Sequence, residues 1–366
     1  MPSRAVVDGD PVAAARAVSL MYATDDGEGI RRLGRGKRFR YTDTRGKAVR
    51  DRETLSRIRA LAIPPAWTSV WICPDPDGHI QATGRDAKGR KQYRYHAKWR
   101  AVRDEAKYTR LVEFCRVLPT VRATVEKDLA CACLCKRKVV ATVVALMERA
   151  QLRVGNDEYV RANGSYGATT LEDRHAKFRG NTLELAYKGK SGVARHIKLT
   201  DRRLARIVRA CRDLPGQRLF QYVDGDDIRG ITSTDVNDYL REASGGPFTA
   251  KDYRTWAATL GAAMMLCSLE HPESARECKK CVNEVVEAVA AKLGHTTSVC
   301  RSSYIHPRVI DDFTSGVLAR RIGRQVARRL HEGIAIEASA IEVDALRAIE
   351  PIVAGYLAPL TRRRHA

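Results

Sequence analysis

The sequence predicts an α+β protein, in which a small sheet-rich N-terminal domain precedes a larger, mainly helical domain that carries one three-stranded β meander. Between residue 20 and about residue 100, short segments alternate apolar with polar residues and are separated by Gly and Asp, as in a sheet with tight turns. From about Trp99 onward, apolar residues recur three and four positions apart over long stretches, which is typical of amphipathic helices. A chain of 366 residues is long enough for two domains. We therefore expect a sheet-rich domain at 20–100 and a mainly helical domain at 101–366.

The sheet-rich domain is predicted to hold short strands and one helix. The helix extends from about Arg52 to Ala62, because Pro64 and Pro65 stop it. Residues 1–19 are rich in Ala and Val without a clear pattern, so we expect a loose N-terminal arm there. Strands are expected at residues 38–41, 44–47, 71–73 and 79–83.

A basic segment at residues 83–96 is the most informative part of this domain. It is predicted to be a basic turn that leads into a strand, with Gln92, Tyr93 and Tyr95 interleaved among cations. Cations bind phosphates, while an amide and phenols can reach base edges or sugars. A solvated hairpin with incidental tyrosines would show the same pattern, but the density of cations beside aromatics favours nucleic-acid contact. The cations proposed for this role are Arg85, Arg90 and Lys91.

The mainly helical domain is interrupted by one predicted meander. Strands at residues 171–178, 182–187 and 193–199 form it, and its last turn, Gly189-Lys-Ser-Gly192, places Lys190 at the tip of a hairpin. Helical periodicity marks residues 110–114, 123–129, 138–152, 201–212, 233–243, 254–269 and 320–336.

The stretch from residue 282 to residue 304 combines two predicted helices. Valines at helical spacing lead to Leu293, and Gly294 is suited to end that helix in a left-handed cap, which leaves His295 in a loop. A second short helix then carries Tyr304 and stops before Pro307. A histidine and a tyrosine are thus expected close together on two rigid supports. Taken alone, the pair would favour a core tyrosine and a capping histidine.

The charge of the chain favours a polyanionic partner. Lys and Arg number 65 against 43 Asp and Glu, which gives a formal net charge of +22, and the cations are spread along the chain. This balance is typical of proteins that bind nucleic acids. Solvated basic faces would have the same composition, so the charge does not decide the function by itself.

Neither a metal, a nucleotide nor a membrane is expected as a partner. Cys278 and Cys281 form a CxxC pair, but no second pair stands at zinc-site spacing, so the ten cysteines are expected to be reduced thiols of a cytoplasmic protein. The longest nearly apolar run, residues 139–147, is too short to span a bilayer. No phosphate-binding Gly-x-x-x-x-Gly-Lys-Ser/Thr loop occurs. The acidic run Asp224–Asp227 is interpreted as a solvated loop rather than a magnesium site, so no cofactor is expected.

Four upstream positions join Tyr304 in a recognisable order. Arg153, Lys190, Arg254 and His295 precede it, and His295 stands nine positions before Tyr304. With the signature Gly-Arg-Lys-Gln-Tyr-Arg-Tyr at 89–95, this order closely resembles the bacterial and poxvirus-type DNA topoisomerase IB family over residues 20–307. The resemblance also implies the mainly helical catalytic fold that this family shares with tyrosine recombinases.

The resemblance assigns a role to each of these positions. It implies that Tyr304 is the nucleophile, that Lys190 is a general acid, and that Arg153, Arg254 and His295 hold the scissile phosphate. It also implies that Gln92, Tyr93, Tyr95, Tyr159 and Lys251 contact DNA. The expected activity is relaxation of positive and negative supercoils through a 3′-phosphotyrosyl intermediate, without ATP or an obligatory metal.

The chemistry of phosphodiester cleavage asks for the same residue types. Attack on the phosphate builds negative charge on two non-bridging oxygens, for which guanidiniums offer forked, charged donors. A neutral tyrosine is a poor nucleophile and must lose its proton as it attacks. The leaving 5′ alkoxide needs a proton donor, and a lysine on a hairpin tip suits that task.

Two alternatives have different consequences. A tyrosine recombinase would usually carry a histidine three residues before the second arginine, where this chain has Lys251, and would have a helical N-terminal domain. A non-catalytic DNA-binding protein with the same fold is disfavoured, because no catalytic position is substituted. We expect a monomer that acts on double-stranded DNA in the cytoplasm, associated with the nucleoid.

Overall fold

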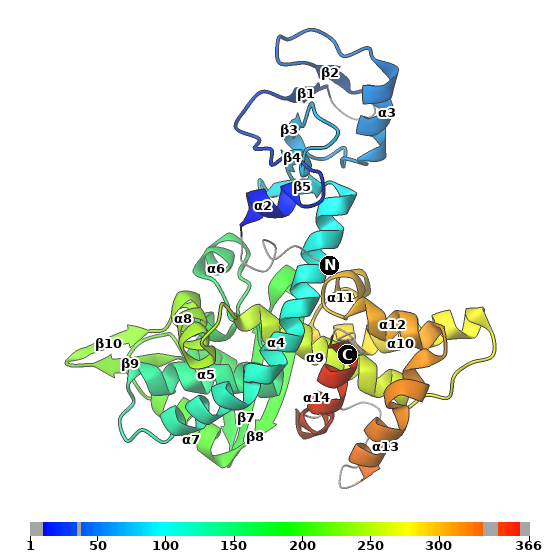
Figure 1. Cartoon of the computed structure of the whole chain (residues 1–366). Helices are drawn as coiled ribbons and strands as arrows, with labels where there is room; N and C mark the ends of the chain where they lie inside the picture. The colour runs from blue at the N-terminus through cyan, green and yellow to red at the C-terminus, as the bar shows by residue number, and fades with distance from the viewer. Residues whose placement is uncertain (1–9, 35–37, 332–342, 359–366) are drawn as a thin grey trace. The chain divides into compact units, whose positions relative to one another are not determined.

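The computed structural model describes residues 10–34, 38–331 and 343–358. The chain forms two compact units, Met1–Arg110 and Leu111–Ala366 (Figure 1). The division falls inside the long helix α4 (Ala97–Leu129), about ten residues beyond the boundary expected near residue 100. The predicted fold class, a sheet-rich domain followed by a mainly helical one, is confirmed.

The first unit is built on a five-stranded antiparallel sheet. Helix α3 (Arg52–Ala60) starts at Asp51, whose carboxylate accepts a hydrogen bond from the Thr54 amide at 2.7 Å. Ile58 of this helix is buried against one face of the sheet together with Val70 and Ile72. The strand order is β2-β1-β3-β4-β5, with bounds β1 Ile30–Leu33, β2 Arg40–Thr42, β3 Thr68–Ile72, β4 Ile80–Arg85 and β5 Lys91–Tyr95.

Two strand assignments in this unit differ from the prediction. Residues 44–47 form a turn instead of a strand, because the Asp43 carboxylate accepts hydrogen bonds from the amides of Arg45 and Lys47 at 2.9 and 2.8 Å. Such side-chain bonds to the following backbone compete with strand pairing. Strand β1 was not predicted, because its sequence Ile-Arg-Arg-Leu does not alternate.

The segment that precedes the sheet is partly helical. Helix α2 (Pro11–Arg16) starts at Asp10, whose carboxylate accepts from the amides of residues 12 and 13. Ala14 and Ala15 are buried beside Leu20 and Trp99. The expected loose arm is therefore wrong for residues 11–16, which owe their order to tertiary packing. Residues 1–9 lie outside the described part of the chain.

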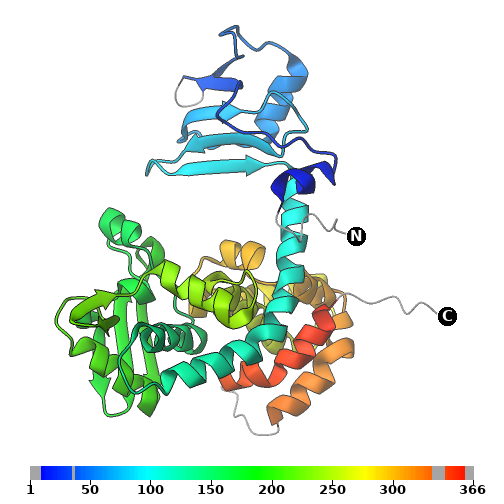
Figure 2. The same cartoon turned by 60° about the vertical axis from the view of Figure 1, so that its left-hand side comes forward.

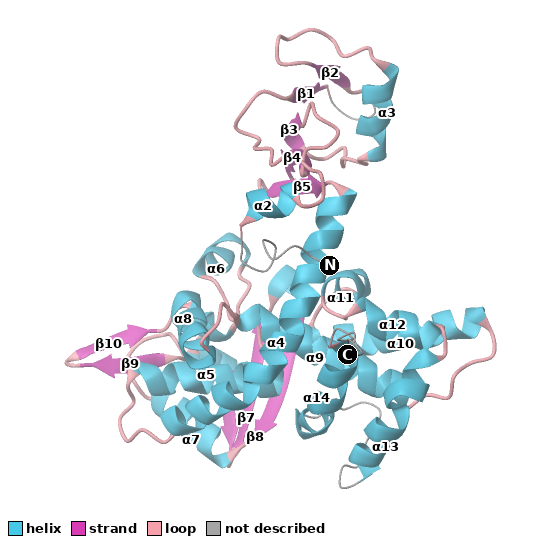
Figure 3. Ribbon diagram, viewed as in Figure 1, coloured by secondary structure: helices cyan, strands magenta, loops and turns pink. Residues whose placement is uncertain are grey.

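The second unit is mainly helical, as Figure 3 shows. The helices predicted at residues 110–114 and 123–129 are both part of α4, which continues through Pro119. Pro119 cannot donate a backbone hydrogen bond, but packing of the buried Leu118 and Val121 outweighs that loss. The other helices are α5 Lys136–Ala150, α6 Asp157–Asn163, α7 Arg202–Arg212, α8 Ser233–Ser244, α9 Ala250–Cys267, α10 Ala275–Leu293, α11 Thr297–Ser303, α12 Pro307–Thr314, α13 Arg324–His331 and α14 Val343–Leu357.

The predicted meander is present in this unit, but its first strand begins at Ala176 rather than at residue 171, because residues 173–175 form a 3₁₀ turn. Strands β6 (Ala176–Arg179), β7 (Thr182–Lys188) and β8 (Ala194–Thr200) pair antiparallel in that order. Helices α5 and α7 lie against this sheet (Figure 2). Leu183 and Leu185 of β7 are buried, whereas alternate positions of β8 are exposed. The sheet thus buries its apolar side chains against the helices and carries a hairpin tip at residues 189–193.

A second hairpin replaces the loop expected around the acidic run. Strands β9 (Gln221–Asp224) and β10 (Asp227–Gly230) pair antiparallel, and Arg229 bridges Asp224 and Asp227 at 3.1 and 3.2 Å. Gln221 and Tyr222 of β9 are buried and the other strand residues are exposed, so the hairpin shows no apolar alternation that would have predicted it.

The C-terminal helices only partly match the prediction. The segment expected at 320–336 begins as a π-helical turn at residues 319–323 and continues as α13. Residues 332–336 of that prediction, and the basic tail at 361–365, lie outside the described residues.

Candidate active site

Arg254 occupies the centre of the candidate site, on the first turns of α9. The helix starts at Thr249, where a capping box with Asp252 fixes the first turn. Arg254 is only 5 % exposed, and its guanidinium donates to the carbonyls of Gln151 and Leu293. These two carbonyls mark the ends of α5 and α10, and Gln151 has the left-handed φ of 55°. Burial, with the neighbouring charge of Arg153, lowers the pKa of Arg254 to about 10, so the side chain stays cationic at neutral pH.

Arg153 reaches the same point from the segment that follows α5. Its Nη2 donates to the carbonyl of Gly294 at 2.8 Å and lies 3.1 Å from His295 Nδ1. Burial lowers its pKa as well. Within the described residues, neither Arg153 nor Arg254 forms an ion pair with a carboxylate. The two guanidiniums therefore leave positive charge in the site for an anion to neutralise.

His295 lies between these two guanidiniums. Gly294 ends α10 in the left-handed region with φ 64°, as the sequence predicted, and turns the chain toward Arg153. His295 Nε2 lies 2.9 Å from Arg254 Nη2. Burial, then the charges of Arg254 and Arg153, lower the pKa of His295 to about 3, so the imidazole is neutral at physiological pH. A neutral imidazole has one acceptor nitrogen, so it can accept from only one of the two arginines.

Tyr304 stands beside this histidine, just past the last residue of α11. Its ring centroid lies 4.1 Å from that of His295, with 35° between the ring planes. Its backbone is fixed to α9, because Thr259 Oγ1 donates to the Tyr304 carbonyl at 3.2 Å and accepts from the His306 amide at 3.1 Å. The following residue, Ile305, is completely buried. The phenol is therefore held on two elements, next to the cationic cluster.

Lys190 lies in the short turn that joins β7 to β8. The Gly189 amide donates to the Val193 carbonyl at 2.8 Å, and Ser191 adopts a left-handed φ of 62°. The Lys190 side chain is exposed. Its charge is one of those that lower the pKa of His295, and the residue before it, Gly189, lines the same hollow as Arg153 and Arg254. The structure therefore brings together all five residues predicted for catalysis, on five different segments of one unit.

Arg195 is a further residue of the site that the sequence did not reveal. It pairs with Tyr187 across β7 and β8, and lines a hollow together with Arg153, Gly189 and Arg254. Its guanidinium donates to the carbonyls of Ala291 and Lys292 near the end of α10. The only sequence signal was its place on the predicted strand 193–199, which does not distinguish it from other strand residues.

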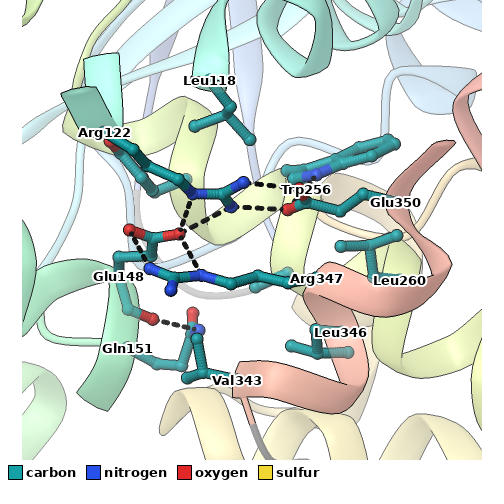
Figure 4. Close-up of a pocket in the computed structure, with 12 residues that line it drawn as sticks. Leu118, Arg122, Glu148, Gln151, Trp256, Leu260, Val343, Leu346, Arg347 and Glu350 are labelled. Atoms are coloured by element: carbon teal, nitrogen blue, oxygen red, sulfur yellow. Dashed lines mark hydrogen bonds and ion pairs between the residues drawn. The ribbon is translucent and has the colours of Figure 1, made fainter. Parts of the chain in front are cut away.

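A network of ion pairs and hydrogen bonds joins helix α9 to the helices around it. Arg122 of α4 forms two hydrogen bonds of 2.8 Å with Glu350 of α14, and also bonds Glu148 of α5 at 2.7 Å (Figure 4). Trp256 of α9 donates its indole N–H to Glu350 at 3.2 Å, and Arg347 pairs with Glu148 at 3.0 Å. Helix α9, which carries Arg254, is thereby tied to three other helices.

The predicted DNA-contact residues of the first unit lie on and beside the edge strand β5. Tyr93 and Tyr95 share one face, where their rings stack 5.8 Å apart with 9° between planes, and Tyr93 is 42 % exposed. Lys91 points to the same face and pairs with Asp25 at 2.8 Å. An edge strand with exposed aromatics and cations is accessible to a partner.

Gln92 lies on the opposite face of β5. Its amide donates to Asp86 at 3.0 Å, and Arg90 pairs with the same carboxylate at 2.6 Å. The hydrogen bond from Arg90 lowers the pKa of Asp86 to about 2. Arg85 donates to the Gly89 carbonyl at 2.8 Å within the same turn. The strand thus divides the predicted contact residues between its two faces.

Tyr159 and Lys251 belong to the second unit, like the catalytic candidates. Tyr159 is 47 % exposed on the short helix α6. Lys251 is exposed on α9, one turn before Arg254. Residues 85–95, in contrast, lie in the first unit, so the structure defines each group of contact candidates within its own unit.

The described residues contain neither a metal-ligand cluster nor a membrane-spanning helix. No group of three or more His, Cys, Asp or Glu residues among them is placed to hold a metal ion. Cys278 of the CxxC pair has its sulfur 3.7 Å from His271 Nε2. No helix in this part of the chain has the length and apolar character needed to cross a bilayer.

Comparison with known proteins gives three matches. The family described as eukaryotic DNA topoisomerase I, catalytic core, matches residues 96–326, and the family described as bacterial DNA topoisomerase IB, N-terminal domain, matches residues 38–86. DNA topoisomerase 1B of Acanthamoeba polyphaga mimivirus is 32 % identical to this chain over 286 residues, which is 76 % of this chain and 85 % of the viral protein. The first match covers all five catalytic candidates.

Proposed function

Because the chain belongs to the DNA topoisomerase IB family, we propose that it relaxes supercoils by cutting one strand of duplex DNA with Tyr304, which becomes joined to the 3′ phosphate. The observation that carries this assignment is the 4.1 Å approach of the Tyr304 and His295 rings, with two guanidiniums converging on the same imidazole. A phenol beside an unneutralised cationic pocket is suited to attack a phosphodiester.

The cleavage step follows from the charges that develop. The Tyr304 oxygen gives its proton to solvent water as it attacks phosphorus, while Arg153 and Arg254 stabilise the charge on the non-bridging oxygens. Preorganised donors of this kind each contribute about 100- to 1,000-fold to rate. His295, neutral in the free protein, has one ring N–H to give to a non-bridging oxygen. When the phosphate enters, it relieves the unfavourable arrangement of one imidazole between two sets of donors.

Lys190 completes the step at the leaving group. As the bond between phosphorus and the 5′ oxygen breaks, the ammonium gives that oxygen a proton, so a 5′ hydroxyl leaves. In resealing, the same hydroxyl returns its proton to Lys190 as it attacks the phosphotyrosine. The bond between phosphorus and the Tyr304 oxygen breaks, and the phenolate takes a proton back from water. One ester replaces another, so the step conserves bond energy and needs no ATP. Relaxation in the presence of EDTA is expected to proceed.

The DNA partner extends the site beyond the catalytic cluster. The net charge of +22 and the cations of strand β5 support binding of the phosphate backbone, and Gln92, Tyr93, Tyr95, Tyr159 and Lys251 are proposed to contact the duplex. We further propose a monomer that acts at the nucleoid in the bacterial cytoplasm; sedimentation of the free protein tests the oligomeric state.

A trapping experiment tests the assignment of Tyr304. Protein denatured during reaction with end-labelled duplex is expected to remain attached to the 3′ side of a nick. Tyr304→Phe removes one hydroxyl and should bind DNA without forming a covalent adduct. Tyr222→Phe, which removes a tyrosine hydroxyl from β9, should form the adduct as the unchanged protein does. Attachment to a 5′ phosphate, or adducts in the Tyr304 variant, would overturn the mechanism.

A further inference from the structure

One side chain joins the two catalytic segments that carry Lys190 and His295. A Cβ atom added at Gly189 would lie 3.1 Å from Arg195 Cγ, so the aliphatic stem of Arg195 packs directly on this glycine. A Cβ atom added at Gly294 would lie 2.9 Å from Arg195 Nη1, so the guanidinium covers this second glycine. Gly189 immediately precedes Lys190, and Gly294 immediately precedes His295. Arg195 therefore spans the gap between the two segments.

The guanidinium is anchored at the end of α10. Arg195 Nη2 donates to the Lys292 carbonyl at 2.9 Å, and Nη1 donates to the Ala291 carbonyl at 3.3 Å. The last carbonyls of a helix lack partners within the helix and carry partial negative charge, so a forked cation there is stabilising. The stem of the same side chain starts on β8, opposite the buried Tyr187. Both ends of the connection are thus fixed by rigid elements.

The two segments differ in what else holds them. The His295 loop is also bound by Arg153, which donates to Gly294, and by Arg254, which donates to Leu293. The backbone of the Lys190 turn closes on itself between Gly189 and Val193, and the Lys188 carbonyl accepts from the Tyr166 amide at 2.8 Å. Those bonds fix the shape of the turn and its place beside residue 166, whereas Arg195 connects it to the end of α10. Loss of Arg195 is therefore felt mainly at the turn.

We propose that Arg195 is a positioning residue, which sets the place of the Lys190 ammonium relative to the 5′ oxygen by bracing the hairpin turn against the C-terminal end of α10. The inference rests on the proposed role of Lys190 as the general acid. Misplacement of a catalytic group by about 1 Å costs on the order of 100-fold in rate. Arg195→Ala is therefore expected to slow cleavage about 100-fold.

Two further variants separate the parts of this side chain, and a third variant serves as their control. Arg195→Met keeps the stem on Gly189 but removes both hydrogen bonds, and Arg195→Lys keeps the charge with a single donor group. The lysine variant should recover part of the rate that the methionine variant lacks. Arg179→Ala is the matched control, because the substitution removes the same charge. Arg179 lies at the far end of the same sheet, and its side chain is 80 % exposed. This variant should cleave within a few-fold of the unchanged enzyme.

A modified substrate decides whether Arg195 acts through Lys190. When sulfur replaces the 5′ bridging oxygen, the leaving thiolate needs no proton, so Lys190→Ala should cleave this DNA at nearly the rate of the unchanged enzyme. Arg195→Ala should be rescued in the same way. On ordinary DNA, the double variant should be no more than a few-fold slower than Lys190→Ala alone. Binding of all variants is measured in the Tyr304→Phe background, and thermal unfolding confirms that they fold.

The outcomes separate the inference from the function beneath it. If Lys190→Ala is not rescued by sulfur, the general-acid role fails, and the inference fails with it. If Lys190→Ala is rescued but Arg195→Ala is not, the general acid stands, and Arg195 instead acts on the phosphate or on His295. Additive losses in the double variant on ordinary DNA would overturn the inference in the same way.

Discussion

Two arginines that lie close to helix α9 have opposite surroundings. Arg122 meets two carboxylates, Glu148 and Glu350, near Trp256 of α9. Arg254, two residues before Trp256, meets only backbone carbonyls and the imidazole of His295. In the first region the arginine charges are balanced by carboxylates, and in the second no described carboxylate pairs with Arg254, so we propose that a DNA phosphate balances its charge. The difference teaches that the charge of Arg122 is used within the fold, whereas the charge of Arg254 is available to an anion at the candidate site.

The largest expected effect is on stability, in the balanced region. Glu350→Ala leaves Arg122 short of one partner and removes the acceptor of the Trp256 indole. Breaking such a pair from one side costs about 3 kcal/mol of unfolding free energy. The measurement is urea unfolding, with Glu184→Ala as control, because Glu184 pairs with the exposed Arg179 at 3.8 Å and should cost under about 1 kcal/mol. Well below its melting temperature, Glu350→Ala should still cleave DNA. An equal loss of unfolding free energy in Glu350→Ala and Glu184→Ala would show that the network around Arg122 is no more stabilising than an exposed ion pair.

Arg254→Ala should show the reverse pattern. Cleavage is expected to fall about 100- to 1,000-fold, because the charge on the non-bridging oxygens is no longer met. The loss of unfolding free energy should be smaller than for Glu350→Ala, since the variant also removes a buried cation without a carboxylate partner. Single-turnover cleavage and urea unfolding measure the two quantities. DNA with a 5′ bridging sulfur should not rescue this variant, and rescue there would assign Arg254 to the leaving group instead.

The neutral imidazole of His295 makes the same region sensitive to pH. Its pKa in the folded protein, about 3, lies below its ordinary value of 6.5. Between these values the unfolded chain binds a proton that the folded protein does not, so stability falls as pH falls from 6.5 toward 3. His295→Asn lacks this group, so its unfolding free energy should decline less steeply over that range. Parallel declines would show that the cationic cluster does not depress the pKa.

Local signals in the sequence were enough to place the catalytic groups. Gly294 ended α10, and the turn from Gly189 to Gly192 closed the hairpin, because left-handed caps and tight turns depend on the residues that form them. Helix α2 was missed because Ala14 and Ala15 are ordered by contact with Trp99, which is distant in sequence. The hairpin of β9 and β10 was missed because its strands show no apolar alternation.

The contacts of Arg195 could not have been predicted in this way. Its acceptors are backbone carbonyls that lie 96 and 97 residues further along the chain. Every residue carries a carbonyl, so an acceptor of this kind has no sequence signature. The same holds for Arg254, whose type and order were recognisable although its two carbonyl partners were not. The sequence therefore indicates which groups are proposed to react, and the structure adds what holds them.

The smallest expected effect lies on the exposed strand β5, where cations already have carboxylate partners. Lys91 pairs with Asp25, so a DNA phosphate must replace that carboxylate rather than fill an unbalanced site. In the Tyr304→Phe background, Lys91→Ala should lower the slope of log affinity against log salt by about 0.9, the contribution of one phosphate contact, between roughly 50 and 200 mM salt. Asp25→Asn should strengthen binding by no more than about fivefold, because exposed pairs contribute under about 1 kcal/mol.

Arg59→Ala, on helix α3 at the other face of the sheet, serves as the control for lost charge. It should leave the salt slope closer to that of the unchanged protein. An unaltered slope in Lys91→Ala would show that this lysine does not reach a phosphate. Weaker binding by Asp25→Asn would show that the carboxylate orients Lys91 toward DNA instead of competing with the phosphate. Strand β5, although exposed, would then resemble the preorganised region around Arg254.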